Sequence, residues 1–163
     1  MPSTTVRRTI EASADKVWDA LDDFGNTQVY NPAIARSKPT SDIKSGLGAT
    51  RHCDIDSAGK KHVQEEITAY DPASRTFTVE LVGGSGRPPM EKVEAHFDVK
   101  ELAPDRSEVA MTFDLTTKGP IQAAMAMMAK GMLSKAGNRV LAGLDHHATT
   151  GENVQELDKS AIR

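Results

Sequence analysis

The sequence lacks several features that would assign it quickly to a class of protein. It holds a single cysteine, Cys53, so an internal disulfide is impossible. It has no run of about 18 consecutive apolar residues, and residues 1–11 contain no apolar segment typical of a secretory signal. The net charge is −3 and no basic block stands out, which argues against nucleic-acid binding. We therefore expect a cytoplasmic protein without integral membrane association.

The composition that is present is ordinary for a folded domain. Hydrophobic residues make up 38% and charged residues 26% of the 163 positions, which is enough apolar material for one core. No repeat or linker divides the chain. We expect one domain over residues 1–150, followed by a polar, flexible tail over residues 151–163.

Most of the chain up to Thr117 alternates between apolar and polar residues, as half-buried strands do. A first strand is expected over residues 4–11, followed by a helix over residues 14–24 that Ser13 would cap. The proline-containing segment 27–45 is interpreted as a loop with one short helical turn near Asn26. Five further strands are expected over residues 49–56, 60–70, 75–82, 90–102 and 107–117.

Within the stretch from Gly119 to Gly151 that follows these strands, the sequence predicts one long helix of about 28 residues. Ile121, Met125, Met128 and Met132 recur at spacings of 4, 3 and 4, which places them on one face. We expect this methionine face to close a cavity and the second half of the helix to seal the core. Arg139 falls on the same face as Met132, and the pattern leaves open whether it points to solvent or into the cavity.

The order strand, helix, five strands, long helix defines an α+β class. Strands joined in hairpin succession form an antiparallel sheet, and their alternation indicates one buried and one solvated face. The predicted architecture is a curved antiparallel sheet of about six strands wrapped around the C-terminal helix.

Four segments carry a resemblance that covers the chain to about His147. They are Ile10-Glu11-Ala12-Ser13-Ala14-Asp15-Lys16-Val17-Trp18 with Leu21 and Phe24, Tyr30-Asn31-Pro32, Gly46-Leu47-Gly48-Ala49-Thr50-Arg51, and Glu65-Glu66-Ile67-Thr68-Ala69-Tyr70-Asp71-Pro72. In these segments the sequence resembles the polyketide cyclase/dehydrase-like family of the START and birch-pollen-allergen-like helix-grip superfamily. The resemblance implies a cavity between sheet and last helix that binds lipids, polyketides or other hydrophobic molecules. Some members catalyse ring closure or dehydration, whereas many only bind.

The strand pairing of residues 49–70 predicts one unusual polar pair. With a loop at Ser57-Ala58-Gly59, Cys53 lies opposite Val63 and Arg51 lies opposite Glu65. Because Cys53 and Val63 favour the inner face, the period of two carries the charged pair inward as well. Either the pair sits at the sheet margin with its charged groups in water, or it is a polar anchor in an apolar cavity.

Two functions follow. The first is a carrier or sensor that binds a small hydrophobic molecule, with no cofactor and no metal. The second is an enzyme of the cyclase or dehydratase type, for which Glu65, Arg51 and Tyr30 are the candidate acid, base or orienting groups. Tyr30 either packs at the core edge or lines the pocket mouth. The candidate ligand-binding residues are Tyr30, Arg51, Glu65, Phe77, Val79, Phe97, Met111, Phe113, Met125, Met128 and Met132.

Other chemically capable residues are assigned structural roles. His52, Asp54 and His62 share the outer face of a hairpin, where a solvated polar surface is favoured over a metal site. Cys53 lies among apolar residues, which raises a thiol pKa and makes it unreactive. The Gly83–Gly86 segment lacks the strand-then-helix context of a nucleotide-binding loop and is interpreted as a mobile loop at the cavity mouth.

Overall fold

The computed structural model describes residues 2–156. The helices and strands, in chain order, are β1 Ser3–Ile10, α1 Ala14–Asp22, the 3-10 helix η1 Phe24–Val29, β2 Arg36–Pro39, β3 Thr50–Asp54, β4 His62–Asp71, β5 Thr76–Gly83, β6 Lys92–Ala103, β7 Arg106–Thr116, α2 Gly119–Thr150 and the 3-10 helix η2 Val154–Glu156.

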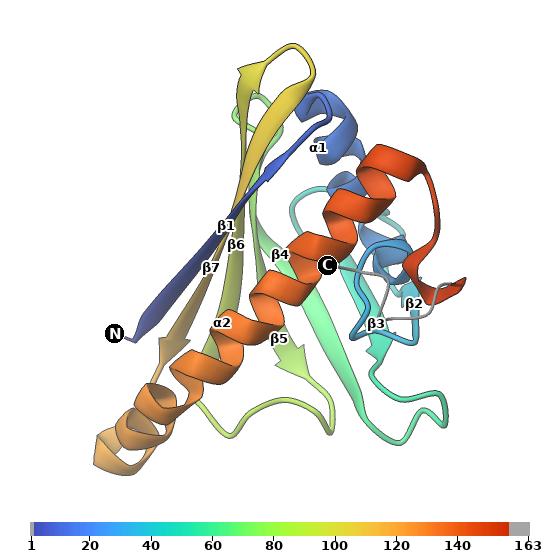
Figure 1. Cartoon of the computed structure of the whole chain (residues 1–163). Helices are drawn as coiled ribbons and strands as arrows, with labels where there is room; N and C mark the ends of the chain where they lie inside the picture. The colour runs from blue at the N-terminus through green and yellow to red at the C-terminus, as the bar shows by residue number, and fades with distance from the viewer. Residues whose placement is uncertain (1, 157–163) are drawn as a thin grey trace.

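The strands form one antiparallel sheet in the order β1-β7-β6-β5-β4-β3-β2, and α2 runs across it (Figure 1). This is the predicted helix-grip α+β fold. The sheet has seven strands rather than six, because β2 lies inside the segment 27–45 that was expected to be a loop. β2 is a short, polar edge strand that ends in Pro39, a residue that edge strands tolerate, so apolar alternation does not reveal it.

The short helix α1 forms where its capping residue predicts. The Lys16 amide donates to Ser13 Oγ at 3.2 Å, which satisfies one of the unpaired amides at the helix start. Val17, Trp18 and Leu21 are buried on one face of α1, as their spacing predicts. The helical turn expected near Asn26 is η1.

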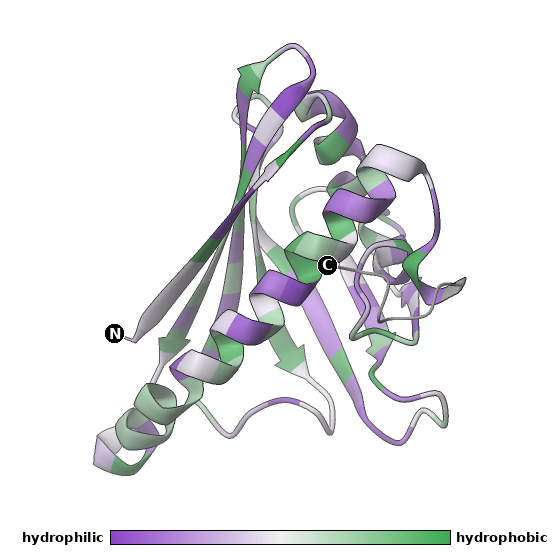
Figure 2. Cartoon of the chain, viewed as in Figure 1, coloured by the Kyte–Doolittle hydropathy of each residue, from purple (hydrophilic) through white to green (hydrophobic). Residues whose placement is uncertain are grey.

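The long helix α2 spans 32 residues, somewhat more than the predicted 28. Pro120 lies in its first turn, and Gly151 ends it in the left-handed conformation with φ 76°. There the Gly151 amide donates to the carbonyl of His147 at 2.8 Å, the usual glycine termination of a helix. Figure 2 shows mostly pale green, moderately apolar turns at the start of α2, and deeper green bands alternating with purple ones further along the helix. No helix within residues 2–156 has the length and apolarity needed to cross a bilayer.

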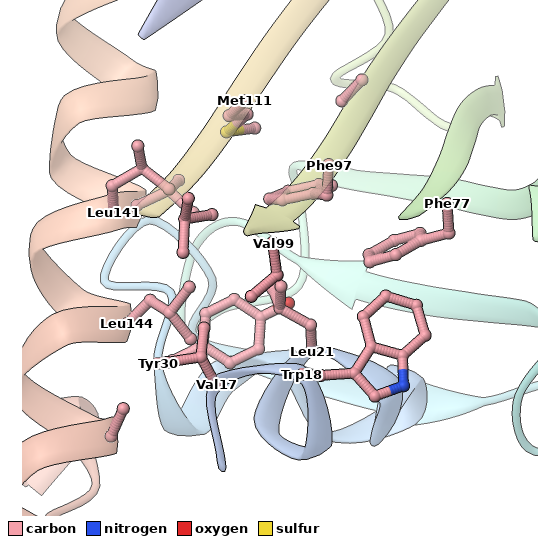
Figure 3. Packing of buried hydrophobic residues seen from close by; sticks show 14 of the residues in the cluster. Val17, Trp18, Leu21, Tyr30, Phe77, Phe97, Val99, Met111, Leu141 and Leu144 are labelled. Atoms are coloured by element: carbon pink, nitrogen blue, oxygen red, sulfur yellow. The ribbon is translucent and has the colours of Figure 1, made fainter. Parts of the chain in front are cut away.

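The main hydrophobic core lies between the sheet, α1, η1 and the second half of α2 (Figure 3). Phe77 and Phe97 stack with ring centroids 4.9 Å apart. Trp18 and Phe77 pack in a T-shaped arrangement with ring centroids 5.8 Å apart. Leu141 and Leu144 of α2 are fully buried against this cluster. The second half of α2 therefore seals the core, as predicted.

The chain after α2 turns back onto the domain. Val154 is fully buried in η2, and the Gln155 side-chain amide donates to the carbonyl of Asn31 at 3.0 Å. An apolar side chain and a hydrogen bond thus place residues 154–156 against the η1 region, and the flexibility expected for the tail stays a prediction. The rest of the predicted tail, residues 157–163, lies outside the described part of the chain.

Candidate functional site

An open apolar groove of about 450 Å³ lies between the sheet and the first half of α2. Strands β6 and β7 supply its floor, the segment after the Gly83–Gly86 loop supplies one wall, and α2 supplies the other. Its lining residues are Pro88, Pro89, Met90, Val93, Leu115, Met125, Met128, Ala129, Met132 and Leu133. None of these ten has an ionisable side chain, so the groove can offer dispersion contacts and apolar surface but no acid or base.

The groove lies over a small hydrophobic core of its own. Met90, Val93, Leu115 and Ala126 are buried together, separate from the main core. Val93 and Leu115 are direct partners across β6 and β7, so strand pairing places them side by side. The groove therefore rests on a packed base that strand register fixes.

The methionine face of α2 forms the rim of this groove and is exposed. Met125, Met128 and Met132 have 39%, 84% and 71% of their surface accessible. The expectation that this face closes a cavity is wrong in this respect, because the first turns of α2 extend beyond the sheet (Figure 1) and their methionines border an open groove. The three methionines do lie together at one apolar site between sheet and helix.

The predicted aromatic and aliphatic lining residues lie elsewhere. Tyr30, Phe77, Val79, Phe97 and Met111 are buried in the main core (Figure 3), and Phe113 is partly buried against it. None of the six lines the groove. They contact α1, η1 and the second half of α2, so the structure divides the candidate residues into a packed set and a groove set. For Tyr30, this selects core packing over the pocket mouth.

The Arg51–Glu65 pair has the predicted register, and it is buried. Arg51 Nε donates to Glu65 Oε2 at 2.5 Å, and Arg51 Nη1 donates to the carbonyl of Phe24 at 2.9 Å. The guanidinium also lies 3.9 Å from the centroid of the Phe24 ring. With side chains only 6% and 12% exposed, the pair does not place its charged groups in water, so the margin interpretation is wrong.

The protonation of Arg51 follows from two opposing effects. Burial favours its neutral form, but the charge of Glu65, with smaller contributions from Tyr30 and Cys53, more than offsets burial and raises the pKa of Arg51 above its ordinary value. Arg51 is therefore a permanent cation whose hydrogen bonds go to Glu65 and the η1 backbone. Neither Arg51 nor Glu65 lines the groove.

Cys53 is buried next to this pair, with its sulfur 3.9 Å from Glu65 Oε2. Burial, together with the neighbouring carboxylate, raises the pKa of the thiol to about 12. The reactive thiolate is therefore scarce at neutral pH. This agrees with the sequence prediction of an unreactive cysteine.

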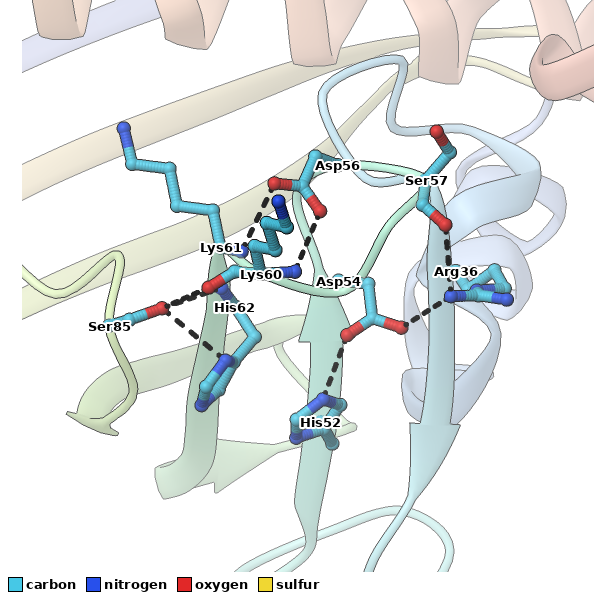
Figure 4. A network of polar contacts seen from close by, with 9 residues as sticks. All are labelled: Arg36, His52, Asp54, Asp56, Ser57, Lys60, Lys61, His62 and Ser85. Atoms are coloured by element: carbon cyan, nitrogen blue, oxygen red, sulfur yellow. Dashed lines mark hydrogen bonds and ion pairs between the residues drawn. The ribbon is translucent and has the colours of Figure 1, made fainter.

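The outer face of the β3–β4 hairpin carries a polar network (Figure 4). His52 bonds Asp54 at 3.0 Å and stacks on His62 with ring centroids 5.0 Å apart, while Arg36 pairs with Asp54 at 3.3 Å. The His52 hydrogen bond, with Arg36, lowers the pKa of Asp54. Within residues 2–156, no three His, Cys, Asp or Glu side chains converge as metal ligands would.

The Gly83–Gly86 loop is hydrogen-bonded to the start of β4 and the residues just before it. The Gly86 amide donates to the carbonyl of His62 at 2.8 Å, and Ser85 Oγ donates to the carbonyl of Lys60 at 2.9 Å. Gly84 has φ 102°, and a Cβ there would lie 2.4 Å from the His62 carbonyl oxygen, so glycine is required. The loop leads into Pro88 and Pro89 of the groove wall, and its predicted mobility stays a prediction.

The sequence prediction missed seven of the groove residues. Five lie outside α2 and two within it: Pro88, Pro89, Met90, Val93 and Leu115 outside, Ala129 and Leu133 within. Their signal was present in part, since Val93 and Leu115 share the inward face of predicted neighbouring strands. The alternation does not predict the position of α2 along the sheet. That position determines which strand ends the methionines of α2 contact.

The order of elements and the long helix across an antiparallel sheet define the helix-grip class. Within it, the family model described as polyketide cyclase/dehydrase and lipid transport matches residues 1–149. The chain belongs to this family.

Solved structures agree with this assignment at the level of the fold. The protein XoxI from Bacillus cereus superposes with a TM-score of 0.74 at 19% identity, over 92% of this chain and 97% of that one. The Zhui aromatase/cyclase from Streptomyces sp. R1128 gives 0.66 at 19% identity, over 91% and 96%. Ara h 8.0201 gives 0.66 at 20% identity, over 91% and 97%. A search of curated proteins finds no significant match.

Proposed function

We propose that this chain binds a small hydrophobic molecule, of lipid, polyketide or aromatic type, in the groove between the sheet and the first half of α2, as a carrier or sensor. The observation that carries this proposal is the groove of about 450 Å³, whose lining side chains are all apolar. Sites for small molecules typically have volumes of roughly 300–1,000 Å³ and mostly apolar walls. The lipid-transport part of the family description agrees with this role.

The methionines favour a binding site that accepts variable ligands. Met90, Met125, Met128 and Met132 contribute four of the ten lining residues. Thioether side chains are unbranched and polarisable, so they adapt to ligands of different shape. An exposed group of methionines is also costly to keep in water, and a bound apolar molecule would remove that cost.

An enzyme of the cyclase or dehydratase type is less well supported. Such chemistry needs an acid or base within hydrogen-bond reach of the substrate. The candidates Tyr30, Arg51 and Glu65 are buried in the main core or paired with each other, and none is among the groove residues. Binding without catalysis is the function that this arrangement supports best.

Two neighbouring methionines allow a matched test. Met128 lines the groove, whereas Met127 is 60% exposed on another face of α2 and does not line it. The probe is 1-anilinonaphthalene-8-sulfonate, titrated by fluorescence into wild type, Met128→Asp and Met127→Asp. Because Met128→Asp puts a charge into an apolar wall, we expect roughly tenfold or greater loss of affinity, against less than about twofold for Met127→Asp.

Equal loss in the two variants, or an unchanged affinity in Met128→Asp, would exclude the groove as the binding site. Thermal unfolding of each variant provides the folding control, since both methionines are exposed and neither substitution removes core contacts. Native mass spectrometry of the purified wild-type protein would identify any bound apolar molecule by its mass.

A further inference from the structure

The first half of α2 exposes more apolar surface than the groove needs. Ile121 is 76% exposed, and it continues the stripe formed by Met125, Met128 and Met132 toward the helix start. These residues are spaced by three or four positions, so they project from one side of the helix. Together they form an exposed apolar surface that needs an explanation.

The same helix side carries positive charge. At 100° per residue, Lys135 and Arg139 lie on the same side of α2 as Met132. Lys118 is the residue just before the helix, three positions ahead of Ile121. All three are exposed. Lys130 lies on the opposite side of α2, where it is half-buried. The apolar stripe is thus followed by two cations on the same face of α2 and preceded along the chain by a third.

Acidic residues are absent from this whole stretch. Residues 115–144 contain the four cations named above and no Asp or Glu, although the complete chain has a net charge of −3. Glu91, which is exposed next to Met90, lies outside α2 and is not among the groove residues. The positive charge is therefore carried by α2 and by Lys118 just before it, close to the exposed methionines.

We infer that this face of α2 docks on an anionic phospholipid surface. The inference rests on the proposed function, because the rim that would meet the bilayer is the rim of the ligand groove. A helix with an apolar stripe and flanking Lys or Arg residues lies in the plane of the membrane interface, with its apolar side chains among the acyl chains and its cations at the phosphates. Met128 and Met132 would enter the interface, and an apolar ligand could pass into the groove without crossing water.

The charges select this partner over a second copy of the chain. Pairing two such faces would place Lys135 and Arg139 of each molecule near the cations of the other, and like charges at an interface disfavour association. An anionic bilayer satisfies the apolar stripe and the cations together. Each Lys or Arg near such a surface strengthens binding by roughly fivefold at moderate salt.

The test is vesicle flotation with the full chain. Vesicles contain phosphatidylcholine alone or with about one-third phosphatidylglycerol, and the proteins are wild type, Lys135→Glu and Lys130→Glu. These two variants change the charge equally but on opposite sides of α2. We expect wild type to bind only the anionic vesicles, with Lys135→Glu weakening binding roughly tenfold and Lys130→Glu no more than about threefold.

Several results would overturn the docking proposal. The first three are that wild type does not bind anionic vesicles, that it binds both vesicle types equally, or that the two variants lose the same amount of affinity for the vesicles. The fourth is that light scattering shows a stable dimer that does not bind the vesicles. Titration of Lys135→Glu with 1-anilinonaphthalene-8-sulfonate, without vesicles, separates the two proposals. Because Lys135 does not line the groove, the variant can lose vesicle binding and still bind 1-anilinonaphthalene-8-sulfonate, which would support both proposals. Vesicle binding by wild type without binding of the dye in the groove would count against the groove proposal only.

Discussion

The two halves of α2 face different surroundings although they form one continuous helix. In the second half, Leu141 and Leu144 are fully buried against the main core. In the first half, Met128 and Met132 are mostly exposed at the rim of the groove. Branched leucines suit a fixed packing arrangement, whereas methionines suit a surface that adapts. The comparison indicates that one end of the molecule provides stability and the other end provides the binding surface.

The helix glycines divide in the same way. A Cβ added at Gly143 would lie 2.0 Å from the carbonyl oxygen of Tyr30, which means that α2 approaches the η1 region too closely for any side chain. A Cβ added at Gly131 would meet nothing within 4 Å. The same residue type therefore serves close packing in the second half and is unconstrained by packing in the first.

The largest expected effect is at the buried pair of the packed end. Arg51→Ala would leave the Glu65 carboxylate buried without its partner and the Phe24 carbonyl without its donor. Breaking a buried ion pair in this way costs roughly 3–5 kcal/mol, so we expect that loss in the free energy of unfolding measured with urea. Because Arg51 does not line the groove, the folded variant should retain wild-type affinity for 1-anilinonaphthalene-8-sulfonate.

A double variant provides the control for this substitution. Replacing both members, as Arg51→Met with Glu65→Leu, removes the uncompensated charge, and buried pairs replaced by apolar residues often lose little stability. We expect the double variant to be more stable than Arg51→Ala. If instead Arg51→Ala kept its stability and lost ligand affinity, Arg51 would be a ligand anchor and the separation into two ends would be wrong.

A smaller loss is expected from Gly143→Ala. The new methyl group cannot avoid the Tyr30 backbone and the Pro32 ring, which lies 2.9 Å from it, and overpacking of this kind costs roughly 1–3 kcal/mol or somewhat more. The better helix propensity of alanine returns only about 1 kcal/mol. We therefore expect a net loss of about 2 kcal/mol by urea unfolding, and a variant as stable as wild type would contradict the close approach of α2 to η1.

The architecture could be predicted from sequence because its signals are local. Alternation located the long strands, and a single loop position fixed the pairing of Arg51 with Glu65 and of Cys53 with Val63. The burial of Arg51 could not be foreseen in the same way, since it depends on the carbonyl and ring of Phe24. Those groups reach the pair through the conformation of η1, which was expected only as one short turn beside a loop.

The groove was predicted only in part for a related reason. Periodicity places Met125, Met128 and Met132 on one helix face but does not say what lies opposite that face. The structure shows that α2 is longer than the strands it crosses, so its first turns meet the ends of β6 and β7 instead of the aromatic core. Predicting each element separately therefore placed the aromatic core residues and the helix methionines in one binding site, although the fold keeps them apart.

The smallest expected effect has the opposite sign. Gly131→Ala replaces a glycine in the interior of α2 where an added Cβ meets nothing within 4 Å, and alanine favours a helix by about 1 kcal/mol relative to glycine. We expect the free energy of unfolding to rise by up to that amount in urea, with groove affinity unchanged because Gly131 does not line the groove. The same substitution would then stabilise one half of the helix and destabilise the other. A loss of stability in Gly131→Ala comparable to that of Gly143→Ala would mean that the first half is also packed, against a partner or a second copy, and would overturn the contrast between the two halves.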